Sequence, residues 1–301
     1  MKKIFILSLI AIIFSCKNEA NDGKFNVVTT TTMITDLVKN IGGDVITLQG
    51  LMGSGVDPHL YKASEGDVSK LANADLIFYN GIHLEGKLVE VFEKMEHQNI
   101  NTKAIADGID HNTLINSSLF QGNYDPHIWF DISYWKQATE YVTSKLSETL
   151  PEHKTTFEAN GKTYIEKLTV LEKEIKSVIK TLPLEKRILV TAHDAFGYFG
   201  RAYGFEVVGL QGLSTATEAG VQDVQRLASL IIEKNIKAIF VESSVPKRTI
   251  EALQAAVKSK GHDVEIGGTL YSDALGNAGT VEGTYIGMFE YNINTIVNAL
   301  K

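Results

Sequence analysis

Residues 151–182 read PEHKTTFEANGKTYIEKLTVLEKEIKSVIKTL, and this stretch decides how the chain is organised. Its apolar residues recur at intervals of three and four and are Phe157, Tyr164, Ile165, Leu168, Leu171, Ile175, Val178, Ile179 and Leu182. That spacing is the period of a helix with one buried face. Pro151 suits the first turn of such a helix, and Pro183 stops it. The stretch predicts one helix of about 45 Å, at ~1.5 Å per residue.

This long helix has two interpretations. Its pattern is close to the heptad repeat of a dimeric coiled coil, although coiled coils usually sustain the repeat over a longer stretch. Gly161 also interrupts the pattern, at a cost of about 1 kcal/mol. We favour a stiff helix that connects two domains, and the coiled coil stays as the alternative.

The segments on both sides of the helix alternate β-branched stretches with helical ones, which is typical of α/β domains with mainly parallel sheets. The predicted strands are residues 25–28, 45–50, 76–79, 103–106, 187–191, 205–209, 238–241 and 264–266. The predicted helices are residues 33–41, 63–72, 86–93, 133–150, 196–203, 221–235, 247–260 and 284–300. A chain of 301 residues suffices for two such domains. We predict two similar α/β domains, residues 25–150 and 183–301, joined by the helix at 151–182.

The N-terminus carries an export pattern. Two lysines precede an apolar stretch at residues 4–14 that is shaped like a signal peptide and is too short to span a bilayer. Cys16 follows directly and is the only cysteine, so no internal disulfide can form. Its placement resembles the lipobox of bacterial lipoproteins. We predict a signal peptide at 1–15 and a lipidated tether at 16–24; the alternative is an ordinary signal peptide with an incidental thiol.

The tripeptide Asp-Pro-His occurs twice in predicted loops, ending at His59 and at His127. Proline fixes one backbone angle, and the preceding aspartates, Asp57 and Asp125, are placed to orient an imidazole through its other nitrogen. A single histidine in a loop is more often solvated. Two histidines in matched settings favour metal ligands.

The second domain offers two more candidates at predicted strand ends, where ligands bind in open parallel sheets. His193 follows one strand, and Asp273 comes just after residues 267–271. Three imidazoles and one carboxylate suit zinc or manganese. Taken singly, His193 and Asp273 are equally compatible with buried polar residues or caps, and spacing does not show that the four converge. Glu242, at another strand end, is a candidate to support a ligand.

Four motifs of the second domain resemble a known family: TAHDAFGYF at 191–199, GLQG at 209–212, VESS at 241–244 and YSD at 271–273. Over nearly its full mature length the chain resembles the metal-binding lipoproteins of bacterial ABC transporters, most closely the TroA-like zinc/manganese-binding proteins. The resemblance implies that His59, His127, His193 and Asp273 bind one metal ion in the cleft between the domains.

The same resemblance implies a capture protein rather than an enzyme. Such a protein is a monomer, exported to the periplasm or cell surface and anchored by lipid, and passes Zn²⁺ or Mn²⁺ to a permease subunit driven by a cytoplasmic ATPase. Several manganese-binding relatives have glutamate where this chain has His193, whereas zinc-specific relatives often carry a long histidine-rich loop that this chain lacks. The choice of metal therefore stays open.

Two other functions compete with metal capture. A metal-dependent hydrolase needs an open coordination position, a water and a base such as Glu242. Neither a His-Glu-x-x-His motif nor a Gly-x-Ser-x-Gly motif occurs. Surface adhesion is the second alternative, and no repeat or binding motif supports it. A net charge of −7 argues against nucleic acid as a partner.

Overall fold

The computed structural model describes residues 23–118, 120 and 124–301. The predicted signal peptide, most of the tether and Cys16 lie outside these residues. Within the part of the chain that is described, no helix is long and apolar enough to cross a membrane.

The first half, residues 25–150, contains a parallel four-stranded sheet in the order β2-β1-β3-β4. Its main elements are β1 (Phe25–Thr29), α1 (Thr32–Gly42), β2 (Ile46–Gly50), α2 (Glu65–Ala72), β3 (Leu76–Tyr79), α3 (Val89–His97), β4 (Asn101–Ala104) and α4 (Ile132–Thr149). Successive strand residues point to opposite faces of the sheet. Val27 and Phe78 therefore join the core with α1 and α4, while Val28 and Ile77 pack with α2 and α3.

The second half, residues 183–301, repeats this plan with two parallel strand pairs, β5–β6 and β7–β8, and with β5 beside β7. Its main elements are β5 (Ile188–His193), α6 (Gly197–Tyr203), β6 (Glu206–Gln211), α7 (Val221–Glu233), β7 (Ala238–Glu242), α8 (Arg248–Ser259), β8 (Glu265–Leu270) and α9 (Tyr285–Leu300). The predicted α/β class with parallel sheets is confirmed.

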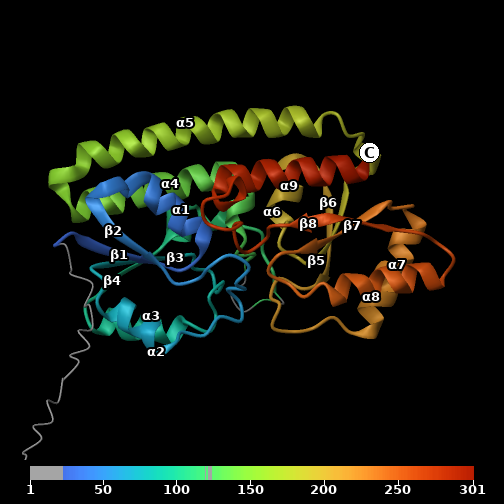
Figure 1. The fold of residues 1–301 in the computed structure, drawn as a ribbon, viewed down its shortest axis with the longest axis horizontal. Helices are drawn as coiled ribbons and strands as arrows, with labels where there is room; N and C mark the ends of the chain where they lie inside the picture. Colours follow the sequence, from blue (N-terminus) through green and yellow to red (C-terminus); the bar gives the residue numbers. More distant parts are fainter. Residues whose placement is uncertain (1–22, 119, 121–123) are drawn as a thin grey trace, which may run out of the picture.

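The predicted long helix is present as α5 (Lys154–Ile179). It begins later than predicted because Pro151–His153 form a separate 3-10 turn. In Figure 1, α5 runs along one side of the molecule over helices of both halves, and it contacts α1, α4 and α9. Its buried residues belong to the main core of this chain, so its apolar face is used within the chain rather than in a coiled coil.

Gly161 does not interrupt α5, and its position explains why glycine is present. A Cβ atom at Gly161 would lie 2.4 Å from Thr143 Oγ1 on α4, well inside van der Waals contact. The missing side chain lets the two helices approach closely. The local cost in helix propensity is offset by this packing.

Most predicted element limits shift by one or two residues, and apart from α5 the largest differences are at α3 and β8. Helix α3 covers Val89–His97 instead of 86–93, because Phe92 and Met95 are its buried residues. Strand β8 extends to Leu270, through two glycines that lie beyond the predicted strand 264–266. The register shifts between Ile239 and Phe240, so Gly267 is the extra residue, and a Cβ there would meet Phe240 at 2.9 Å. The next residue, Gly268, has a φ of 143°, which favours glycine.

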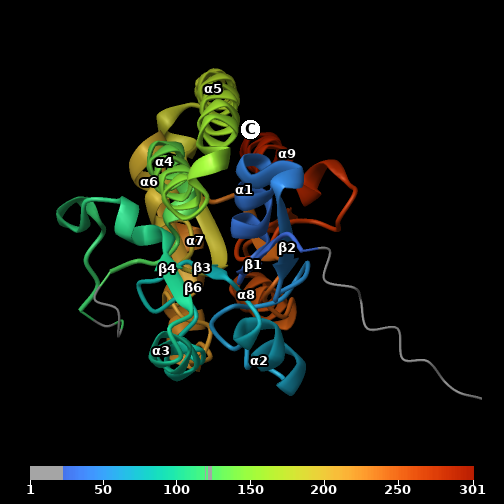
Figure 2. The same cartoon turned by 90° about the vertical axis from the view of Figure 1, so that its left-hand side faces the viewer.

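One apolar core extends through both halves. It contains Val27 and Phe78 of the first half, residues of α5, and Leu189 and Phe289 of the second half. Figure 2 shows α5 on the same side as α1 and α4, with α2 and α3 on the opposite side. The halves are thus connected by shared packing as well as by the covalent link.

Candidate metal centre

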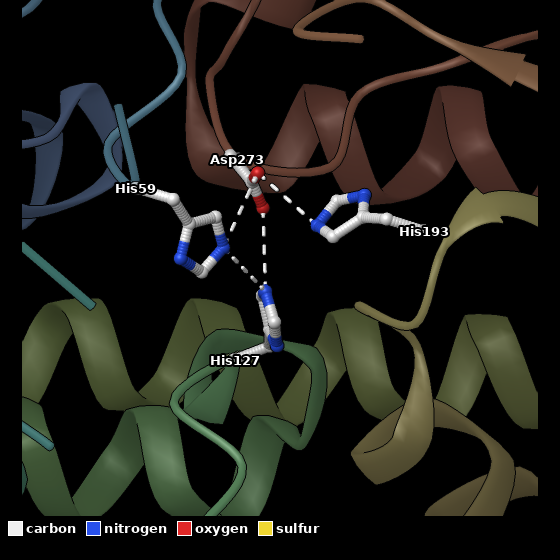
Figure 3. Close-up of side chains that lie close together, drawn as sticks. All are labelled: His59, His127, His193 and Asp273. Atoms are coloured by element: carbon white, nitrogen blue, oxygen red, sulfur yellow. Dashed lines mark hydrogen bonds and ion pairs between the residues drawn. The ribbon is translucent and has the colours of Figure 1, made fainter. Parts of the chain in front are cut away.

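The structure brings together all four residues that the sequence predicts as ligands. His59 lies in the loop between β2 and α2, His127 lies just before α4, His193 ends β5, and Asp273 lies in the loop after β8. Figure 3 shows the three imidazoles arranged around the Asp273 carboxylate. One potential ligand atom from each residue lies within 4.8 Å of the others. Elements from both halves therefore meet at one point.

The imidazoles present their Nε2 atoms to one another and to the carboxylate. His193 Nε2 lies 3.2 Å from Asp273 Oδ2, and His127 Nε2 lies 3.6 Å from Asp273 Oδ1. His59 Nε2 is 3.9 Å from Asp273 Oδ2 and 3.3 Å from His127 Nε2. A divalent transition metal accepts this set of three nitrogens and one or two oxygens.

The cluster is almost completely shielded from solvent, since His59 is 4% exposed and the other three residues are 1% exposed or less. Among the described residues, neither oxygen of Asp273 has a hydrogen-bond partner of good geometry. A buried ionised carboxylate without such partners is costly, and a bound cation would compensate it. The residues present therefore fit a metal ion.

The pKa values show how the cluster is charged without a metal. Burial, with smaller contributions from the other two imidazoles, lowers the pKa of His59 to about 3, so its ring is neutral near neutral pH. Burial opposes ionisation of Asp273, but His193, His127 and His59 hold its pKa well below the usual value. Burial also opposes the charged form of His193, but Asp273 and Glu242 raise its pKa well above the usual value. The positive charge of protonated His193 thus offsets part of the negative charge of Asp273 and Glu242.

Two carboxylates support the imidazoles from behind. Asp125 Oδ1 lies 2.6 Å from His127 Nδ1, and Glu242 Oε2 lies 2.6 Å from His193 Nδ1. Glu242 Oε1 also accepts a hydrogen bond from the backbone N–H of His193 at 2.8 Å. Such contacts fix the ring orientation and point Nε2 toward the other ligand atoms.

Asp57, which we predicted to orient an imidazole, instead supports the backbone of the His59 loop. It accepts a hydrogen bond from the backbone N–H of His59 at 2.9 Å and another from the Thr215 hydroxyl at 2.5 Å. Thr215 belongs to the second half, so the bond ties a first-half loop to the opposite side of the centre. Burial raises the pKa of Asp57, with a further increase from Asp273.

Sequence reasoning did not predict the contacts of Thr215 and Tyr198. The Tyr198 hydroxyl donates to the backbone oxygen of Asp125 at 2.8 Å, and accepts from the backbone N–H of Ile115 at 3.2 Å. Thr215 and Asp57 are 158 positions apart, and Tyr198 and Asp125 are 73 positions apart. No local pattern marks such pairs, because they depend on how the halves pack.

Comparisons with known proteins show that the chain is similar to metal-binding proteins. The zinc-binding protein TroA of Treponema pallidum is 50% identical over 287 residues, which cover 95% of this chain and 92% of that protein. The manganese-binding lipoprotein MntA of Bacillus subtilis is 50% identical over 281 residues, covering 93% and 91%. The metal ABC transporter substrate-binding lipoprotein SsaB of Streptococcus sanguinis is 34% identical over 315 residues, covering 100% and 99%.

The fold agrees as well. The solved structure of the periplasmic zinc-binding protein TroA from Treponema pallidum has a TM-score of 0.90, covering 92% of this chain and 99% of that chain at 50% identity. A family model described as the periplasmic component A of the zinc-uptake complex, ZnuA, matches residues 27–299. Almost the whole described chain is included in that match, and the chain therefore belongs to the ZnuA family.

Proposed function

We propose that this chain is the extracytoplasmic solute-binding protein of an ABC transporter, which captures a divalent transition metal ion and delivers it to a membrane permease. The observation that carries this function is the buried cluster of three imidazoles and one carboxylate. Its donor atoms suit zinc and manganese. The relatives TroA and MntA are named as zinc-binding and manganese-binding proteins.

In this proposal the ion is bound by His59 and His127 from the first half and by His193 and Asp273 from the second. For zinc, which is usually four-coordinate in structural sites, four protein ligands leave no coordination position open for a substrate, and this favours holding an ion over catalysis. A metal-dependent hydrolase would need an open position with a bound water. The names of the relatives describe metal binding and transport and give no support to the hydrolase or adhesin alternatives.

Asp125, Glu242 and Asp57 have supporting roles in the proposal. Asp125 and Glu242 orient the imidazoles of His127 and His193, since each lies 2.6 Å from an Nδ1 atom. Asp57 holds the loop that carries His59.

Zinc and manganese are both cargo in this proposal. Three imidazole nitrogens favour zinc over manganese by the usual order of divalent affinities, and a bidentate Asp273 would favour the harder manganese ion. TroA and MntA, which are named for different metals, are each 50% identical to this chain. Overall sequence identity to these relatives therefore does not indicate which of the two ions this chain carries.

We further propose that the protein is a monomer that is exported and held at the membrane by lipid on Cys16. MntA and SsaB are named lipoproteins, and SsaB is named as part of a metal ABC transporter. The partners are then a permease subunit and its cytoplasmic ATPase. Several acyl chains on one cysteine hold a protein more firmly than a single chain.

Uptake in cells tests this function. Cells that lack the protein should take up less radiolabelled zinc or manganese when the metal is scarce, and the wild-type chain should restore uptake. We expect His193→Ala and Asp273→Ala to fail, while Val170→Ala, at an exposed position of α5, restores it as a matched control. An equal rate of metal uptake in cells with and without the protein would contradict the transport role.

A further inference from the structure

The loop that carries Asp273, residues 271–284, contacts the second half at its start and the first half on both sides of Asp273. We call it the Asp273 loop. At its start, Asn292 of α9 accepts from the backbone N–H of Tyr271 at 2.9 Å and donates to its carbonyl oxygen at 2.7 Å. These are contacts within the second half. The next contacts along the loop include two with the first half.

The first of these is made by Trp129. Its indole Nε1–H donates to the carbonyl oxygen of Ser272 at 2.9 Å, and both residues are buried. The Trp129 ring also contacts the His127 imidazole edge to face, with ring centroids 5.3 Å apart. Trp129 therefore touches a ligand of the first half and holds the residue that precedes the ligand of the second half. It links the positions of His127 and Asp273.

The second contact is made by Thr32, in the first turn of α1. Its hydroxyl oxygen accepts from the backbone N–H of Leu275 at 2.8 Å, two residues after Asp273. An open crevice of about 520 Å³ lies beside this bond and is lined by Thr32, Leu275 and neighbouring residues of α1 and the loop. Water can therefore compete for the Thr32 bond more easily than for the buried Trp129 bond.

Together these contacts hold the backbone on both sides of Asp273 with side chains of the opposite half. We propose that Trp129 and Thr32 are positioning residues that keep the Asp273 carboxylate in coordinating geometry, and that loss of their two hydrogen bonds precedes metal release. This inference rests on the proposed function. It assigns release to local movement of the Asp273 loop, with the three histidines held by their own supporting contacts.

The test compares tryptophan variants of the purified full chain loaded with Zn²⁺. Trp129→Phe keeps an aromatic ring beside His127 but removes the donor to Ser272. We expect zinc to dissociate into excess chelator about ten- to hundredfold faster, the factor by which loss of an outer contact usually weakens metal affinity. Trp135→Phe is the matched control, because the Trp135 indole is also buried and donates to the Tyr164 hydroxyl, at 3.4 Å, away from the ligands.

Thr32 gives an independent arm of the test. Thr32→Val removes the acceptor at nearly the same volume, and we expect faster zinc release, whereas Thr32→Ser keeps a hydroxyl and should restore the slow rate. Unfolding of the metal-free variants is measured in parallel. Faster release in Trp129→Phe and Thr32→Val, with Trp135→Phe and Thr32→Ser near wild type, supports the inference.

Two results would overturn it. Trp129→Phe and Thr32→Val could release zinc at the wild-type rate, or Trp135→Phe could accelerate release as much as Trp129→Phe, which would mean general loosening of the fold. If Trp129→Phe does not fold, the comparison of Thr32→Val with Thr32→Ser tests the inference by itself. Wild-type protein that binds no zinc would instead refute the proposed function, so the two failures are distinguishable.

Discussion

At the scale of single residues, the centre combines ligand atoms that face inward with carboxylates that lie behind them. Glu242 contacts both the ring and the backbone of His193, while Asp125 contacts the ring and the backbone N–H of His127. The rings of His127 and His193 are thus fixed before a metal arrives. Such preorganisation reduces the cost of ordering ligands on binding.

Glu242→Gln tests the contribution of the supporting carboxylate. The amide keeps the size of the side chain but loses the negative charge beside His193 Nδ1. We expect zinc affinity to fall about ten- to hundredfold in direct titration. Glu251→Gln, at an exposed position of α8, is the control. Affinity equal to wild type in Glu242→Gln would show that the charge does not contribute.

Metal binding should release a proton from His193. Asp273 and Glu242 raise the pKa of His193 despite its burial, so the metal-free ring is protonated near neutral pH. A metal binds only the deprotonated nitrogen, and affinity should therefore weaken as the pH falls below that raised pKa. His59, with a pKa of about 3, adds no proton. Calorimetry in buffers of different ionisation enthalpy should show about one proton released per ion. Binding without proton release would contradict this charge assignment.

The sequence predicts the candidate ligands and the carboxylates Asp125 and Glu242 better than the contacts between distant residues. The repeated Asp-Pro-His tripeptide marks His59 and His127, and the strand-end rule marks His193 and Asp273. Their convergence could not be predicted, because it depends on how two halves pack around α5. The bond between Trp129 and Ser272 joins residues 143 positions apart, and no local pattern indicates it.

At the scale of elements, strand ends and helix packing place the ligands. Strand β5 ends at His193, and the Asp273 loop follows β8, which lies in the same half. Helix α5 packs on α4, and α4 begins shortly after His127. The close approach of these two helices at Gly161 therefore contributes to the frame that holds the centre.

Gly161→Ala tests this packing. Alanine gains about 1 kcal/mol in helix propensity, but its Cβ would lie 2.4 Å from Thr143 Oγ1, which donates to the carbonyl oxygen of Thr139 at 2.7 Å. Overpacking costs about 1–3 kcal/mol, and we expect a net loss of stability in urea unfolding of the metal-free chain. The double variant Gly161→Ala/Thr143→Ala removes the clash and should recover stability. A more stable single variant would contradict the close contact.

The sequence predicts which segments form helices or strands more accurately than it predicts where each one begins and ends. Apolar periodicity predicts α5 because its buried face is continuous. The same reasoning treats Gly161 as an interruption and ends the last strand at residue 266, before two glycines, because the sequence does not show which residues pack against a glycine. In the fold, Gly161 allows helix contact and Gly267 allows contact with Phe240. Both are effects of tertiary packing.

At the scale of the whole molecule, the shared core limits relative movement of the halves. Helix α5 contacts α1 and α4 of the first half and α9 of the second, and apolar residues of both halves form one cluster. A wide opening would expose much of this apolar surface, at about 25 cal/mol per Å². Small local movements expose less apolar surface and therefore cost far less free energy.

We therefore predict that metal binding leaves the overall shape nearly unchanged. Small-angle scattering of metal-free and zinc-loaded protein should give closely similar curves. Hydrogen exchange should instead show protection gained mainly in the Asp273 loop, where local opening exposes few apolar groups. Scattering curves that differ as in a wide closure of two domains would contradict this account.

Metal titration of the purified chain tests the central claim most directly. Protein stripped of metal would be titrated separately with zinc and manganese, beside His193→Ala and Asp273→Ala. The account predicts one ion per chain, with affinity for both metals reduced strongly by either substitution. Absence of stoichiometric binding, or binding that is indifferent to both substitutions, would contradict the proposal that these four residues hold the transported ion.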